Sequence, residues 1–239
     1  MSRTNHSVRT RERLTAILVL VVIPLTLLAG VQLLSARRWY FIALLIVAWL
    51  LLPHFFFFER RRPQAREIVL LAVLTALAVI SRAVFFLVPN FKPVLALLVI
   101  YGAALGGRTG FLLGALTALV SNFLFGQGPW TLWQMFAWGM IGYTAGILVR
   151  HFPALARRWP LAIFGFFAAL CIHGGITNPA GVLLFQAEFS WQAVLASYAL
   201  GLPGDLVLAS STFLFILLLA PSLLTKLARM RRKYAILPE

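Results

Sequence analysis

Residues 91–148 read FKPVLALLVIYGAALGGRTGFLLGALTALVSNFLFGQGPWTLWQMFAWGMIGYTAGIL. The only charged side chains in this stretch are Lys92 and Arg108, and short glycine-rich breaks at 106–108 and 126–129 divide it into apolar runs. About 20 predominantly apolar residues are needed to cross the hydrocarbon core of a bilayer as a helix. The stretch therefore predicts consecutive transmembrane helices.

The composition of the whole chain gives the same prediction. Of its 239 residues, 62% are hydrophobic and 11% are charged, whereas about a quarter of the residues of a soluble domain are charged. The length leaves room for seven or eight spans and for no soluble domain of useful size. The single cysteine, Cys171, lies in an apolar run and is expected to be a buried, inert thiol rather than part of a disulfide or a metal site.

The fold class predicted is an all-α membrane protein with about eight transmembrane helices. They are expected at residues 14–34, 40–58, 67–88, 94–106, 109–125, 132–149, 160–177 and 191–223. A kink is expected in the last helix at Gly201, Pro203 and Gly204. The basic segment ERRRPQAR at 59–66 separates an extension of two helices, residues 1–66, from a core of six helices, residues 67–239.

The charge distribution predicts the orientation of these helices. The net charge of +15 is spread over short clusters between the apolar runs, which is the pattern that orients membrane proteins and not one that indicates nucleic-acid binding. With the N-terminus inside, most Lys and Arg residues fall on the cytoplasmic side. Both termini are basic, which requires an even number of spans. We therefore expect a multi-pass cell-membrane protein with both termini in the cytoplasm.

Polar side chains within or beside the spans are the candidates for function, because they are costly in a membrane. Arg82 is expected near the outer end of its span and Asp205 deep in the last one. Further polar residues gather at the outer ends, namely Asn122, Gln127, Gln134, Asn178, Gln186 and Glu188, with the aromatic residues Phe91, Trp130, Trp133, Trp138 and Tyr198 around them. This pattern predicts an outward-facing, aromatic-lined cavity for a flat or bulky organic ligand.

Structural roles for the same residues stay open. Tryptophans such as Trp130 and Trp133 also serve as anchors at the membrane interface. Arg82 and Asp205 could simply neutralise each other, and His173 is expected to be a hydrogen-bonded packing residue. Ala72 and Ala76 form a small-xxx-small pattern that lets another helix approach closely, and the spacing leaves open whether that helix is internal or belongs to another protein.

Several catalytic motifs are missing from the chain. It has no Gly-x-x-x-x-Gly-Lys-Ser/Thr loop for ATP, no His-Glu-x-x-His and no Gly-x-Ser-x-Gly. We therefore predict no catalytic residue, no metal site and no cofactor, and we expect any ATP hydrolysis to occur in separate subunits. Two alternatives remain: a self-sufficient ion-coupled secondary transporter with Asp205 as its coupling acid, and an intramembrane enzyme that uses His173 and Asp205.

Three segments carry a family resemblance. They are REIVLLAVLTA at 66–76, the stretch at 91–148 with GQGPWTLWQMFAWGMIG at its centre, and GLPGDLVLASSTFLFILLLAPSLLTKLARMRRKY at 201–234. From about residue 66 to residue 234, the chain resembles the S components of energy-coupling factor (ECF) transporters. The resemblance implies a six-helix bundle that binds a vitamin or related micronutrient from outside and works with a transmembrane T subunit and two cytoplasmic ATPases, as part of an ABC-type uptake transporter.

The resemblance also implies roles for particular residues. Ala72 and Ala76 would face the T subunit. Ligand contacts are expected in the loops 90–92, 127–130 and 178–188 and in the outer halves of the later helices. The candidate ligand-binding residues are Asn90, Phe91, Lys92, Asn122, Gln127, Trp130, Trp133, Gln134, Trp138, Asn178 and Asp205. A cobalamin-like corrinoid is the first expectation for the ligand, followed by riboflavin or a queuosine-type precursor.

Overall fold

The computed structural model describes residues 45, 47–49, 51–52, 64–186 and 190–234. Every regular element in these residues is a helix. The elements are α4 (Ala65–Val84), α5 (Val94–Leu105), α6 (Gly107–Phe125), α7 (Trp130–His151), the 3₁₀ turn η3 (Pro153–Ala156), α8 (Arg158–Phe167), the π-helical segment η4 (Ala168–His173), α9 (Gly174–Phe185) and α10 (Trp191–Tyr234). The predicted all-α fold is confirmed for this part of the chain.

Five helices in the described residues are long and apolar enough to cross a membrane. They are α4, α6, α7, the continuous helix Arg158–Phe185 that joins α8, η4 and α9, and α10 over Trp191–Arg231. The shorter α5 is also apolar. The predicted total of eight spans is not confirmed, because the helices expected at 14–34 and 40–58 lie almost wholly outside the described residues.

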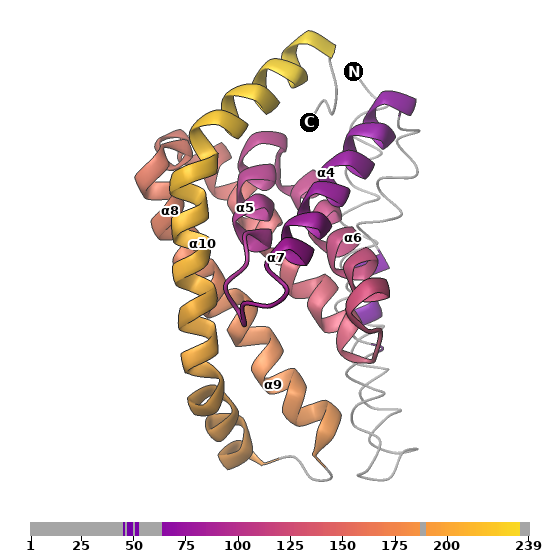
Figure 1. Cartoon of the computed structure of the whole chain (residues 1–239), viewed down its shortest axis with the longest axis vertical. Coiled ribbons are helices and arrows are strands. Elements are labelled where there is room, and N and C mark those ends of the chain that lie inside the picture. Colours follow the sequence, from indigo (N-terminus) through magenta and orange to yellow (C-terminus); the bar gives the residue numbers. More distant parts are fainter. Residues whose placement is uncertain (1–44, 46, 50, 53–63, 187–189, 235–239) are drawn as a thin grey trace, which may run out of the picture.

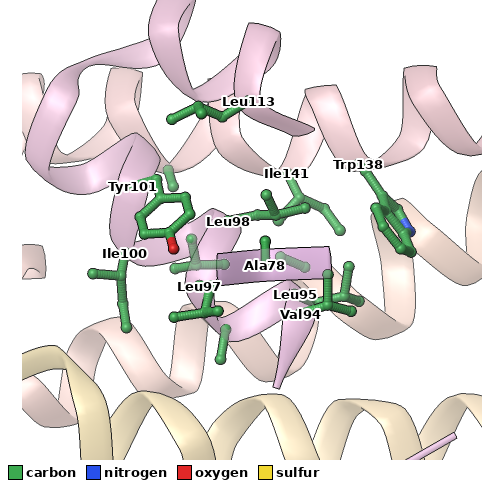
Figure 2. Close-up of a cluster of buried hydrophobic side chains, with 14 of the residues drawn as sticks. Ala78, Val94, Leu95, Leu97, Leu98, Ile100, Tyr101, Leu113, Trp138 and Ile141 are labelled. Carbon is green, nitrogen blue, oxygen red and sulfur yellow. The ribbon is translucent and has the colours of Figure 1, made fainter. Parts of the chain in front are cut away.

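The centre of the bundle is α5. All residues from Val94 to Gly102 are buried, and Figure 1 shows α5 enclosed by its neighbours. A helix that is apolar on every side must be covered by protein or lipid, and twelve residues span only about 18 Å at 1.5 Å per residue. Neighbouring helices therefore cover it, and Figure 2 shows Leu98 and Tyr101 packed with Ile141 of α7.

Glycines bring α5, α6 and α7 into backbone contact. A Cβ atom added at Gly102 would collide with the Gly142 carbonyl oxygen, and one at Gly110 would lie 2.7 Å from the Gly102 Cα. In a membrane, such small residues are needed because close van der Waals packing drives helix association where the hydrophobic effect does not. At the junction between α5 and α6, Gly106 has a φ of 93°, a conformation that glycine adopts without steric cost.

The predicted loop at 178–188 is wrong for most of its length, because α9 continues to Phe185. Pro179 lies inside this helix and has no N–H to donate to the carbonyl four residues earlier, that of Gly175. The Tyr198 hydroxyl of α10 donates to that carbonyl instead, at 3.0 Å. A hydrogen bond from another helix thus compensates for the proline.

Two expectations for the preceding segment are also wrong. Cys171 is exposed rather than buried. His173 was expected to be hydrogen-bonded, yet its buried Nδ1 atom has no hydrogen-bond partner among the described residues. Both residues belong to the π-helical segment Ala168–His173. A π-helical turn holds more residues than an α-helical turn, so it changes which side of the helix the following side chains occupy.

The last helix, α10, extends further than the sequence predicts. It continues without a break through Gly201, Pro203 and Gly204 and ends at Tyr234 rather than at residue 223. Figure 1 shows α10 turning aside in its C-terminal part, which contains Pro221. Since proline removes one backbone hydrogen bond and crowds the preceding turn, it is a common cause of such bends.

The helix directions place most described basic residues at one end of the bundle. The first residues of α4, α6 and α8 and the last residues of α7 and α10 lie together there (Figure 1). The basic residues at this end are Arg66, Arg108, Arg150, Arg157, Arg158, Lys226, Arg229, Arg231 and Lys233. We call it the basic end. Arg82 and Lys92 lie at the opposite helix ends, where α4 finishes and α5 begins.

Candidate functional site

Arg82 organises the first polar cluster at the end opposite the basic end. It lies in the last turn of α4, and its Nη1 atom donates to Ser121 Oγ at 2.6 Å and to Asn122 Oδ1 at 2.9 Å. Both acceptors belong to α6 and are buried. Ser121 and Asn122, near the end of α6, therefore lie beside Arg82 at the end of α4 and accept its hydrogen bonds.

The cluster continues from α6 into α7 through Asn122. Its Nδ2 atom donates to Gln134 Oε1 at 2.8 Å and to Thr131 Oγ1 at 3.1 Å. The Thr131 hydroxyl donates to Gln127 Oε1 at 2.9 Å, and Gln127 Nε2 donates to the Leu119 carbonyl at 3.1 Å. Asn122 therefore has both its donor and its acceptor groups occupied, and it fixes the turn between α6 and α7.

Two aromatic rings flank Arg82. Its guanidinium carbon lies 4.5 Å from the centroid of the Phe125 ring and 5.5 Å from that of Trp138. A cation over an aromatic face is attracted by the ring quadrupole, typically by about 0.5–2 kcal/mol. Arg82 is thus held by neutral hydrogen-bond acceptors and by aromatic rings.

Asp205 and Asn178 form a second polar pair, between α10 and α9. Asn178 Nδ2 donates to Asp205 Oδ2 at 2.7 Å. Two glycines make room for it: a Cβ atom at Gly174 would lie 2.6 Å from Asp205 Oδ2, and one at Gly201 would lie 2.7 Å from Asn178 Oδ1. Larger residues at either position would displace the pair.

The loop between α4 and α5 reaches α10 beside this pair. Asn90, which has a φ of 56°, places its Nδ2 atom 2.7 Å from the position a Cβ atom would take on Gly204. The Lys92 backbone exchanges hydrogen bonds with the Ser211 hydroxyl, its N–H donating at 3.3 Å and its carbonyl accepting at 3.2 Å. Burial, and then the positive charge of Arg82, lower the pKa of the Lys92 ammonium.

Aromatic side chains surround both groups. Phe91 packs with Phe215 of α10 at a centroid distance of 5.5 Å, and Trp130 lies 6.3 Å from Phe185 of α9. The Nε1 atoms of Trp133 and Trp138 are buried and have no hydrogen-bond partner in the part of the chain that the structure describes. An indole N–H group can only donate a hydrogen bond, so Trp133 and Trp138 each add a hydrogen-bond donor to the candidate site.

Comparison with known proteins assigns the family. A family model described as "ECF-type riboflavin transporter, S component" matches residues 63–228. The chain belongs to this family. Among curated proteins, a UPF0397 protein of Vibrio atlanticus is 28% identical over 125 residues, which cover 48% of this chain and 66% of the relative. No solved structure matches the chain.

The S-component assignment confirms the resemblance seen in the sequence, and the structure shows which of the predicted residues meet. Asn122, Gln127, Gln134 and Trp138 gather around Arg82, and Asn178 and Asp205 form a pair. Trp130 is 41% exposed and packs near Phe185 of α9. Arg82 and Asp205 do not pair with each other, because each has other partners in the described residues.

Sequence reasoning about the S component overlooked Ser121 and Thr131. Ser121 accepts a hydrogen bond from Arg82, and Thr131 bonds to both Asn122 and Gln127. Both hydroxyl residues are buried. For Thr131 a sequence pattern exists, since it precedes Gln134 by three residues, a spacing that places the two side chains on the same face of their helix. Ser121 and Asn122 are adjacent in sequence, so no helical spacing identifies Ser121, and its role depends on the position of Arg82 in another helix.

Two hollows on the surface of the S component lie away from these clusters. One, of about 550 Å³, is lined by Thr225, Ala228, Arg229 and Lys233 at the basic end. The other, of about 310 Å³, is lined by Ile163, Phe166, Phe167, Ser210 and Phe213 of α8 and α10. Neither contains a predicted ligand-binding residue. The candidate site is therefore defined by its converging polar and aromatic groups.

Proposed function

We propose that this chain is the substrate-binding membrane subunit of an ECF-type ABC uptake transporter. It captures a vitamin or related micronutrient from outside the cell and delivers it inward together with a transmembrane T subunit and two cytoplasmic ATPases. Membership of the S-component family supports this proposal. In it, the basic end is cytoplasmic, so both termini are cytoplasmic and the Arg82 cluster faces outward.

The observation that carries the proposal is the joint position of two polar groups in an otherwise apolar bundle. Arg82 and Asn122 lie in the last turns of α4 and α6, which begin at the basic end. Asn178 and Asp205 lie nearer to the connection between α9 and α10 than to the basic end. Ionisable side chains inside membrane segments are costly and mark ligand or ion pathways. Aromatic rings beside them supply the flat, apolar contact area that an organic ligand needs.

Helix α4 supplies a surface for the T subunit. Ala72 and Ala76 are exposed on it, and the neighbouring Val73 and Leu77 are about half exposed. An apolar face with small residues at its centre allows another transmembrane helix to approach the backbone closely. We assign this face to the T subunit. Residues 1–66 are proposed as a two-helix extension of the six-helix core at residues 67–239.

For the ligand, we keep a cobalamin-like corrinoid as the first candidate and riboflavin as the second, with a queuosine-type precursor next. The family description names riboflavin, and the aromatic residues Phe91, Trp133 and Trp138 suit either a flavin or a corrinoid ring. Both candidates are bulky, partly planar molecules, and they differ in size and in the groups they present to Arg82.

Reconstitution tests the proposed function. The purified chain is incorporated into lipid vesicles with and without a T subunit and ATPases, and uptake of labelled cobalamin and riboflavin is measured. We expect the chain alone to bind its ligand without transporting it, and ATP to drive uptake only in the complete assembly. Uptake by the chain alone, driven by an ion gradient, would show that it is a secondary transporter instead.

A further inference from the structure

The positive charge of Arg82 has no counter-charge in the described part of the chain. Its two hydrogen bonds go to the neutral groups Ser121 Oγ and Asn122 Oδ1. The acids described are Glu67, which lies at the other end of α4, and Asp205, which bonds to Asn178. A cation in a membrane segment is normally paired with an anion or open to water. Among the described residues, no carboxylate forms a hydrogen bond or ion pair with Arg82.

Hydrogen-bond donors are in excess around Arg82. A guanidinium has five N–H donors, and both Arg82 hydrogen bonds within the described residues start from Nη1, which leaves the N–H groups of Nε and Nη2. Trp138, whose ring lies under the guanidinium, is 4% exposed, and its Nε1 has no hydrogen-bond partner within the described residues. Figure 2 shows Trp138 at the edge of the apolar cluster, with its ring nitrogen on the side away from Ile141.

A purely structural role does not account for this arrangement. The C-terminal end of α4 attracts a cation, but its partial charge is roughly half of an elementary charge, and the aromatic rings of Phe125 and Trp138 carry no net charge. The unused N–H groups of Arg82 and the Trp138 indole N–H, which has no partner among the described residues, together select an acceptor that is itself negatively charged.

We propose that Arg82 anchors an oxyanion of the ligand, a carboxylate or a phosphate group, with Trp138 Nε1 as a second donor. This inference rests on the proposed function and adds the charge of the substrate to it. Guanidinium groups bind carboxylate and phosphate through two parallel hydrogen bonds, and the Nε and Nη2 edge of Arg82 has the geometry for this. Among the candidates named above, cobalamin carries a phosphodiester, whereas riboflavin carries no oxyanion.

Matched probes test the charge directly. The purified full-length chain is titrated with three pairs of compounds that differ in an oxyanion: cobinamide phosphate and cobinamide, riboflavin 5′-phosphate and riboflavin, pantothenate and pantothenol. We expect the oxyanion member of at least one pair to bind about tenfold or more tightly than its partner, which is the range of one charge-assisted contact. Equal binding within every pair that binds, or tighter binding of the neutral members, would overturn the inference.

Asn122→Asp separates ligand binding from folding. The new carboxylate takes the place of Asn122 Oδ1, 2.9 Å from Arg82 Nη1, and neutralises the guanidinium from within. The second carboxylate oxygen takes the place of Asn122 Nδ2, so the Gln134 amide must turn to donate to it. We expect the fold to be kept, as checked by thermal unfolding, and the preference for oxyanions to fall to about the level of the neutral compounds. Arg108→Gln is the charge-matched control, because it removes a cation from the opposite, exposed end of α6, and it should keep the preference.

A third measurement covers a ligand outside these pairs. The small molecule retained by the wild-type chain after purification from native membranes is identified by mass spectrometry, and its retention is compared with that of Asn122→Asp. We expect the wild-type chain to retain an anionic compound and the Asn122→Asp variant to lose it. A retained compound that is neutral would contradict the role of Arg82. So would a compound that both proteins retain equally, or the absence of any retained compound. Uptake of a neutral compound by the complete assembly would leave the proposed function standing while this inference fails.

Discussion

The Asn178 amide donates a 2.7 Å hydrogen bond to the Asp205 carboxylate and so joins α9 to α10. The two membrane helices are thereby joined at the point where Gly174 and Gly201 leave space for the pair. Asp205 is the only carboxylate among the described residues of α5 to α10. Asp205 contributes to ligand binding if the chain is a binding subunit, and it couples transport to an ion gradient if the chain is an ion-coupled carrier.

Replacing Asp205 with Asn tests that distinction. The variant keeps the shape of the side chain but loses the charge-assisted hydrogen bond with Asn178, and we expect ligand affinity to fall by about tenfold, or ~1.4 kcal/mol. Uptake by the complete assembly should remain dependent on ATP. The measurement is ligand titration together with uptake in the presence of ionophores. A wild-type dependence on an ion gradient that disappears in the variant would instead identify Asp205 as a coupling acid.

Substitution of Gly142 by Ala tests the backbone contact between α6 and α7. A Cβ atom at this position would collide with the Gly110 carbonyl oxygen, and a backbone group cannot move aside as a flexible side chain can. We expect a loss of about 1–3 kcal/mol in stability, as for other overpacked interiors. Thermal unfolding in detergent measures it. Gly181→Ala is the matched control, because no atom lies within 4 Å of the added Cβ, and an unfolding temperature lowered equally in both variants would contradict the contact.

A double-mutant cycle tests the hydrogen bond between Tyr198 and Gly175. Tyr198→Phe removes the hydroxyl that bonds to the Gly175 carbonyl and should cost about 1 kcal/mol. Pro179→Ala restores the N–H that α9 lacks, so the same Tyr198→Phe change should cost less in that background. Thermal unfolding of the four proteins gives the coupling energy. Additive effects would show that the tyrosine does not compensate for the proline.

Exposed alanines on α4 provide a test of the partner surface. Ala72→Leu and Ala76→Leu add bulk to the face proposed for the T subunit, where close approach of the helices is required. We expect ligand binding by the isolated chain to be unchanged and ATP-driven uptake by the assembly to fall at least about tenfold. Ala83→Leu, also exposed on α4 but outside the pair, serves as the control. Normal uptake by both variants would place the T subunit on another face.

Helix positions in the core could be predicted from sequence with useful accuracy. The expected helix at 109–125 is observed as α6 over Gly107–Phe125, and that at 132–149 as α7 over Trp130–His151. Glycine and proline end these helices locally, so the neighbouring residues decide the boundary. The prediction was wrong at α9, because Tyr198, a residue from another helix, satisfies the carbonyl that Pro179 leaves free.

The sequence predicted candidate residues for the site but not which of them contact each other. Asn122, Gln127 and Gln134 were selected because polar groups are costly in a membrane, and they do meet. Arg82 and Asp205 were considered as partners for the same reason, yet Arg82 bonds to Ser121 and Asn122. Charge alone favours any opposite pair, whereas the observed partners depend on which helix ends approach each other.

Sequence alone therefore determined membrane residence, the all-helical class and the places where most core helices begin and end, since hydropathy and the backbone limits of glycine and proline act over a few neighbouring residues. The tertiary structure decided that α5 is enclosed, that Pro179 lies within a helix, and that Arg82 has no acid beside it among the described residues. These features depend on contacts between helices far apart in the chain, where packing at the glycines of α5, α6 and α7 sets which side chains can reach each other.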